Sequence, residues 1–212
     1  MLVYIDYLEV AHYLLAKIGL LSVMALTGEY PMKGIIFVKL NQFVDELWGD
    51  EFWDELLQVA DLPSHGIYTS VATYDDAELF TLVSLIMEKK SLTAQEAQIA
   101  FGQWMFEQLL QAAPPEAHKF TDVFKFLYGV QNVIHVEVKK LNPEAILPEF
   151  EFLEETPTTL SFHYISPRKL CYFCEGIVQG LASHTGQQVI VEQTECEHEG
   201  DERCVMKVTK VV

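Results

Sequence analysis

The chain has 212 residues, half of them hydrophobic and 12% aromatic, so it can bury a substantial core as one domain with a short appendage. Its 31 acidic and 14 basic side chains give a formal charge of −17, and such an acidic surface repels nucleic acid and anionic lipid. Four cysteines, all beyond residue 170, do not form the dense disulfide framework of a small secreted domain, so we expect a reduced, cytoplasmic setting.

Residues 1–31 are expected to be an N-terminal extension. Their apolar run is interrupted by Lys17 and is short for a membrane span, while Asp6 and Glu9 stand where a signal peptide would have a basic start. The extension is either an amphipathic helix or sequence translated from an early start codon, and a peripheral membrane helix is a further alternative. The domain itself is placed at residues 32–212.

The apolar pattern predicts helices first and strands second. A short apolar stretch over 34–40 leads into a helix expected over about 43–48. Further helices are expected over about 52–61, 76–86, 94–110, 122–141 and 167–183, and strands over about 150–153, 158–165, 189–194 and 203–211. Thr93 and Glu96 form a capping box, and Asp75 or Asp76 can cap the preceding helix. This order predicts an α+β fold with a helical N-terminal part and a small C-terminal antiparallel sheet with one helix.

His135 stands in the middle of a predicted helix among apolar residues. Such a histidine is most often a hydrogen-bonded core residue. If a cofactor occupies the domain, a neutral imidazole at this place is a common iron ligand.

A cluster of hydrogen-bond donors is predicted where a strand meets the last helix. Tyr164 ends the strand, Ser166 followed by proline is typical of a helix start, and Arg168 adds a forked guanidinium. These groups suit a carboxylate or a phosphate, such as the two propionates of a haem. The alternative is a helix cap beside a surface arginine.

These residues together resemble the haem nitric oxide/oxygen binding (H-NOX) domains. The resemblance runs from Met32 to the C-terminus and rests on Met32-Lys33-Gly34-Ile35-Ile36, the Phe52-Trp53 pair, His135, Pro148, and Tyr164-x-Ser166-x-Arg168 followed by Lys169-Leu170-Cys171. It implies a haem b buried between the helical part and the sheet, with His135 as the proximal iron ligand. Tyr164, Ser166 and Arg168 would bind the propionates, and Pro148 would press on the haem and hold it out of plane.

The resemblance also bears on the choice of gas. Family members that hold oxygen place a tyrosine hydroxyl over the bound gas, and the matching position here is Phe173. The other matching positions of the distal pocket are Ile36, Leu40 and Met105, none of which is a strong donor. A pocket without a donor favours nitric oxide. We therefore expect a nitric oxide sensor in which gas binding releases His135 and moves its helix relative to the sheet.

The cysteines form a second cluster. If Gly200 centres a hairpin, Cys196 and Cys204 face each other across it, and in a reducing setting a metal is favoured over a disulfide. Bacterial relatives hold a structural zinc with three cysteines and a histidine, which match Cys171, Cys196 and Cys204. The histidine position falls at Gln193, so His198 or Cys174 would have to supply the fourth ligand.

The leading hypothesis is a stand-alone gas sensor of the bacterial type, without catalytic activity, that regulates a separate histidine kinase or cyclic-di-GMP enzyme. The second is a zinc or thiol redox sensor in which Cys171, Cys196 and Cys204 are the sensing groups. A haem enzyme is disfavoured because no acid–base pair is evident on the distal side. The Cys171–Cys174 spacing of a thiol oxidoreductase lacks the accompanying βαβ pattern.

Overall fold

The computed structural model describes residues 32–112, 121–141, 147–166 and 171–211. The predicted N-terminal extension, Arg168 and the predicted start of the last helix at Pro167 lie outside these ranges. No helix of the described part is long and apolar enough to cross a membrane.

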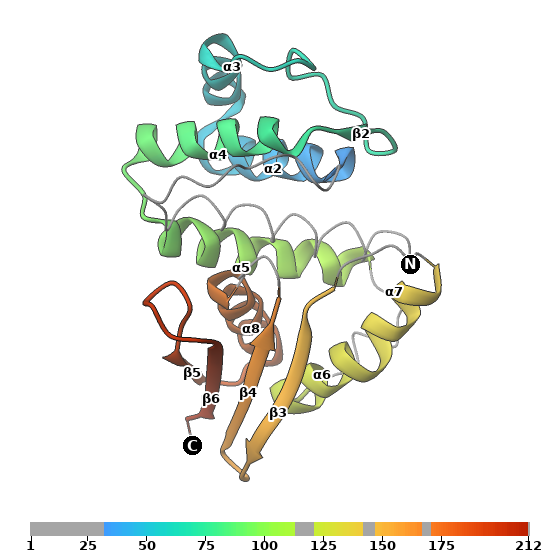
Figure 1. The fold of residues 1–212 in the computed structure, drawn as a ribbon, viewed down its shortest axis with the longest axis vertical. Helices are drawn as coiled ribbons and strands as arrows, with labels where there is room; N and C mark the ends of the chain where they lie inside the picture. Colours follow the sequence, from blue (N-terminus) through green and yellow to red (C-terminus); the bar gives the residue numbers. More distant parts are fainter. Residues whose placement is uncertain (1–31, 113–120, 142–146, 167–170, 212) are drawn as a thin grey trace.

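Helices dominate the first half of the structure. They are α2 (Gly34–Trp48), α3 (Asp50–Val59), α4 (Asp76–Lys90) and α5 (Ala94–Ala112), and the short strands β1 (Met32–Lys33) and β2 (Thr73–Tyr74) pair beside α2. The Asp75 side chain caps α4, and Thr93 and Glu96 exchange the hydrogen bonds of a capping box before α5. Figure 1 shows α5 between this group of helices and the sheet-bearing part.

A continuous helical run follows, although its hydrogen bonding changes along its length. It comprises α6 (Val123–Gly129), the π-helical segment η2 (Val130–Ile134) and α7 (His135–Leu141). Asp122 caps α6 by accepting hydrogen bonds from the amides of Phe124 and Lys125. The helix expected over residues 122–141 is therefore present, but a π-helical turn stands immediately before His135.

The last third forms a four-stranded antiparallel sheet in the order β3-β4-β6-β5. Its strands are β3 (Glu149–Glu155), β4 (Thr159–Ile165), β5 (Val189–Glu195) and β6 (Cys204–Lys210), and α8 (Cys171–Thr185) connects β4 to β5. The predicted strand face is confirmed, since Leu160, Phe162 and Tyr164 are all buried. The predicted α+β fold is confirmed as well.

Two glycines allow α5 to lie directly against α8. A Cβ atom on Gly176 would come 3.0 Å from the Cα of Gly102, and one on Gly102 would come 2.5 Å from the carbonyl oxygen of Phe173. Only glycine leaves room for this approach. The contact fixes the start of α8, from which several side chains of the candidate site project.

Candidate functional site

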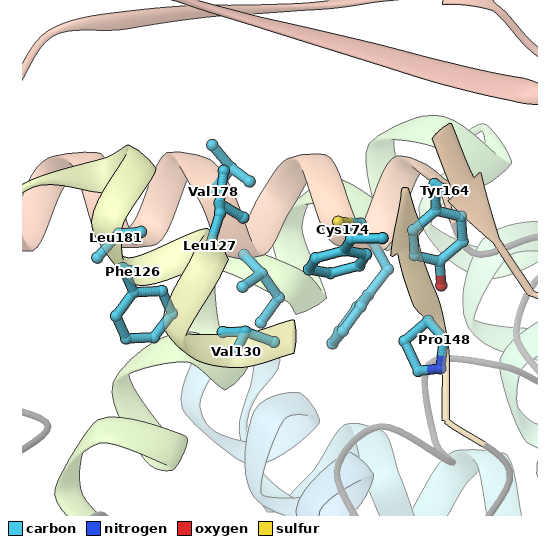
Figure 2. Close-up of a pocket in the computed structure, with 11 residues that line it drawn as sticks. Phe126, Leu127, Val130, Pro148, Tyr164, Cys174, Val178 and Leu181 are labelled. Atoms are coloured by element: carbon cyan, nitrogen blue, oxygen red, sulfur yellow. The ribbon is translucent and has the colours of Figure 1, made fainter. Parts of the chain in front are cut away.

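An apolar cavity of about 50 Å³ lies between the sheet, α6 and α8. It is lined by Phe126, Leu127, Val130, Pro148, Phe150, Tyr164, Phe173, Cys174, Ile177, Val178 and Leu181. Figure 2 shows Pro148 and Tyr164 at one end of this lining and Phe126 and Leu181 at the other. The structure thus brings together four residues singled out in the sequence, namely Pro148, Tyr164, Phe173 and Cys174.

His135 borders a wider depression of about 490 Å³, which shares Pro148 with the apolar cavity. Its side chain is only 5% exposed, and neither ring nitrogen has a hydrogen-bond partner among the described residues. Burial lowers the pKa of His135 to about 4, so its imidazole is neutral at pH 7 and offers a lone pair. A buried polar atom without a partner destabilises a fold, so a bond between this imidazole and a ligand would stabilise the protein.

Phe150 connects the helix of His135 to the sheet. Its ring centroid lies 5.6 Å from that of His135 and 6.0 Å from that of Tyr164. Its amide donates to the side-chain oxygen of Gln131 at 2.9 Å. One turn earlier, the Tyr128 hydroxyl donates to Glu155 at 2.9 Å. Contacts with β3, as well as those within its own helix, therefore hold His135 in position.

Of the predicted donor cluster, Tyr164 and Ser166 lie in the described part, and both are buried. Burial raises the pKa of Tyr164, as does neighbouring Cys174, while the hydrogen bond between Tyr164 and Ser166 acts in the opposite direction. Tyr164 is therefore a neutral donor at pH 7. Arg168, the third member, lies outside the described residues.

The predicted distal residues are all buried, but they do not all line one space. Phe173 lines the apolar cavity, and its ring lies 6.0 Å from that of Phe101 on α5. Ile36, Leu40 and Met105 belong to the same hydrophobic core, on α2 and α5, and line neither of the two spaces described above. Phe173 is thus the predicted distal residue that lines the cavity with Tyr164.

Cys171, Cys196 and Cys204 are brought together, as the sequence predicted. Their sulfur atoms lie within 4.8 Å of one another, and those of Cys171 and Cys196 are 3.6 Å apart. A hydrogen bond between Cys171 and Cys204 raises the pKa of Cys171 and lowers that of Cys204. All three are buried, a setting typical of a structural metal site.

Gln193, at the position of the family's histidine, and the two candidates for a fourth ligand, His198 and Cys174, make other contacts. The Gln193 amide donates to Glu175 at 3.3 Å, and the His198 ring stacks on Tyr172 with centroids 5.4 Å apart. Cys174 lines the apolar cavity and is not a member of the cysteine cluster. Beside the cluster, a Glu197 carboxylate oxygen lies 3.7 Å from the sulfur of Cys204.

Sequence reasoning missed the role of Phe150 and the π-helical turn before His135. The alternation of Phe150 with Phe152 marks a strand face, but it does not say that this face meets a histidine. The segment Val130–Ile134 has the composition of an ordinary helix, so its sequence gives no signal for π-type hydrogen bonds.

Comparisons with known proteins place this geometry in context. A family model described as Haem-NO-binding matches residues 33–193, which is more than half of the chain. The fold is similar to that of an H-NOX protein from S. oneidensis in the Fe(II)NO ligation state, with 31% identity and a TM-score of 0.75 over 85% of this chain and 100% of that one.

Two further solved structures show the same likeness. The H-NOX protein from Shewanella woodyi, bound to IWP-051 in the Fe(II)CO ligation state, is 32% identical with a TM-score of 0.72, covering 85% of this chain and 95% of that one. The Fe(II) unliganded H-NOX protein from K. algicida is 26% identical with a TM-score of 0.72, covering 85% and 97%.

Proposed function

Since this chain belongs to the haem-NO-binding (H-NOX) family, whose domains sense gases through haem, we propose that it senses nitric oxide and signals to a separate protein. The observation that carries the proposal is the buried imidazole of His135, whose two nitrogens have no partner within the described residues. A purely structural histidine would leave both nitrogens unpaired at a cost in stability, whereas a bond to iron would satisfy one of them.

The residues present fit a haem. Its flat hydrocarbon ring requires apolar walls, its iron requires a neutral imidazole, and its two carboxylates require donors. The apolar lining, His135 and the hydroxyls of Tyr164 and Ser166 meet these three requirements. His135 would be the proximal ligand, Tyr164 and Ser166 would hold the propionates together with Arg168, and Pro148 would press on the ring. A bound haem would supply a ferrous iron able to bind nitric oxide, and His135 would be the residue whose bond to it depends on the gas.

His135 would transmit the signal because its position depends both on a bond to iron and on contacts within the protein. Its backbone amide donates to the carbonyl of Val130 in η2, and its ring packs against Phe150. If the imidazole were released, α7 would lose one attachment to the centre of the domain. The helix can then move relative to β3, which gives two arrangements whose balance depends on the gas.

Phe173 supports the choice of nitric oxide over oxygen. Bound oxygen carries partial negative charge and is stabilised by a hydrogen-bond donor, which a phenylalanine ring does not supply. Ile36, Leu40 and Met105, the other expected distal residues, add no strong donor. We therefore expect the ferrous protein to bind nitric oxide and to form no lasting complex with oxygen.

Absorption spectroscopy of the purified ferrous protein, alone, in air and with nitric oxide, tests this proposal. We expect a haem spectrum with one histidine ligand, no lasting change in air, and loss of the histidine ligand with nitric oxide. Replacing His135 with Gly should remove that ligand, and free imidazole should restore it, whereas His184→Gly at the exposed end of α8 should have no effect. A haem-free protein or a stable oxygen complex would contradict the proposal.

We further propose that the cysteine cluster holds a structural zinc. Four ligands around zinc with Zn–S bonds of about 2.3 Å place the sulfur atoms about 3.8 Å apart. The distance of 3.6 Å between the sulfurs of Cys171 and Cys196 supports this proposal. The fourth ligand would come from His198, or from Glu197 beside Cys204. A sensor based on these thiols alone is less well supported, because the family match points to haem.

The output would be regulation of a separate histidine kinase or cyclic-di-GMP enzyme, with no catalytic activity in the sensor itself. Residues 1–31 would be an extension of the sensor domain at 32–212, and the family match begins at residue 33. The test is autophosphorylation of a candidate kinase with the haem-loaded protein, with and without nitric oxide. A gas-independent response would contradict the assignment.

A further inference from the structure

The first turn of the helix that leads to His135 is tied to the sheet by an ion pair. Asp122 caps α6, and its other carboxylate oxygen accepts a hydrogen bond from the Lys210 ammonium at 2.6 Å. The two side chains are 27% and 18% exposed, so water screens this pair less than a surface pair. Lys210 belongs to β6, the strand that pairs with both β4 and β5.

Lys210 is itself held in place by its surroundings. Its backbone amide donates to the carbonyl of Thr158 at 2.8 Å, and its ammonium lies 3.8 Å from the ring centroid of Phe124. A cation over an aromatic face gains a further electrostatic attraction. The same side chain therefore binds the cap of α6 and an aromatic residue of its first turn.

Gln187 adds a second tie, from the loop that follows α8. Its side-chain oxygen accepts a hydrogen bond from the Val123 amide at 2.8 Å, and its side chain also hydrogen-bonds to Asp122. The backbone amide of Gln187 donates to the carbonyl oxygen of Ala182 at 3.0 Å, which fixes the loop to the end of α8. The start of α6 is thus bound to β6 and to α8, and its side chains Val123, Phe124, Phe126 and Leu127 are buried.

The segment directly before His135 is held by fewer contacts: Gln131 accepts a hydrogen bond from the Phe150 amide of β3, and Val130 lines the apolar cavity. None of the five residues Val130–Ile134 is buried, and Asn132 and Val133 are exposed. The amide of His135 donates to the carbonyl of Val130, which is the wide hydrogen bond of a π-helix. Few buried contacts and irregular hydrogen bonding mark the part of an element that deforms first.

We propose that Lys210 is a positioning residue for the sensing site: by holding Asp122 it keeps α6 fixed, so that movement of His135 is concentrated in Val130–Ile134. The predicted effect on release of His135 rests on the proposed function, because it requires that His135 binds iron. With α6 fixed, any displacement of His135 toward an iron would have to be taken up by the π-helical turn, and the resulting strain would favour release. With α6 free, the whole helix can follow His135, and release becomes slower.

The experiment uses the full chain loaded with haem. Lys210→Met removes the ion pair, and Asp122→Asn removes its charge while keeping an oxygen that can cap α6. Lys210→Arg is the conservative rescue, and Lys207→Met is the matched control, since it removes the same charge from the same strand. Stopped-flow absorption with nitric oxide measures loss of the histidine ligand, and amide hydrogen exchange measures the opening of α6 and η2.

We expect Lys210→Met and Asp122→Asn to slow the loss of the histidine ligand by roughly 2- to 30-fold, with Lys210→Arg and Lys207→Met close to the original protein. Exchange should be slower in Val123–Leu127 than in Val130–Ile134 in the original protein, and this contrast should shrink when the ion pair is removed. An unchanged release rate in both ion-pair variants overturns the inference. If the original protein carries no histidine-ligated haem, the proposed function fails. Hydrogen exchange then tests the role of Lys210 separately: if the difference between Val123–Leu127 and Val130–Ile134 is unchanged in Lys210→Met, Lys210 does not hold α6 fixed.

Discussion

Replacing Gly176 with Ala tests the contact between α5 and α8. In an ordinary helix interior this change stabilises by about 1 kcal/mol, because alanine is the better helix former. Here the new Cβ would meet the Cα of Gly102 at 3.0 Å and would also press on the carbonyl oxygen of Ile99. Both neighbours are backbone atoms, so α5 and α8 must move apart, and overpacking of this kind costs about 1–3 kcal/mol.

The net expectation is a loss of up to about 2 kcal/mol in the free energy of unfolding, or up to roughly 8 °C in melting temperature. Urea unfolding followed by circular dichroism measures it. Ser183→Ala, at an exposed position of the same helix, is the control and should be neutral or slightly stabilising. Haem affinity should fall together with stability, because α8 carries Phe173 into the cavity. A Gly176→Ala protein more stable than the original would refute the close packing.

Three further predictions concern other parts of the molecule. Burial alone would raise the pKa of Asp122, but hydrogen bonds, first that from Lys210, outweigh burial and lower the pKa below the unfolded value of about 3.9. Lys210→Met should therefore lower the free energy of unfolding by about 1 kcal/mol or less at pH 7, and this loss should shrink as the pH falls through the folded pKa of Asp122. A loss that grows in acid would contradict the ion pair. Cys171→Ser should lower bound zinc, measured by elemental analysis, from about one ion per chain to near zero, while Cys174→Ala should retain it. Equal zinc contents in the two variants would contradict the proposed zinc site. Phe173→Tyr should strengthen oxygen binding by roughly 10- to 150-fold, and equal oxygen affinities would show that this position does not face the gas.

Much of the fold follows from local signals. The capping box of Thr93 and Glu96, the Asp75 cap and the alternation up to Tyr164 are set by neighbours in the chain, so the sequence predicts them well. The clustering of Cys196 with Cys204 was also foreseeable, because a hairpin turn near Gly200 brings them opposite each other. The cluster and the donors at Tyr164 are therefore the parts of the candidate site most accessible to sequence reasoning.

Other features depend on packing between distant elements. The amide of Gln193 meets Glu175 only because α8 lies against β5, and Cys174 lines the cavity only because close packing on α5 sets the rotation of α8. The π-helical turn at Val130–Ile134 differs from an α-helix in hydrogen-bond register and not in composition. No periodicity in the sequence distinguishes these outcomes from ordinary core positions.

The contacts that tie the His135 helix to β3, through Gln131 and Phe150 and through Tyr128 and Glu155, have a thermodynamic consequence. If gas binding at one end of this connection changes how a partner binds at the sheet, the partner must change the affinity for the gas by the same factor. The gas affinity of the isolated domain is then not the affinity of the assembled sensor. A partner that favours the arrangement with His135 released would make the assembly respond at lower gas concentrations than the domain alone.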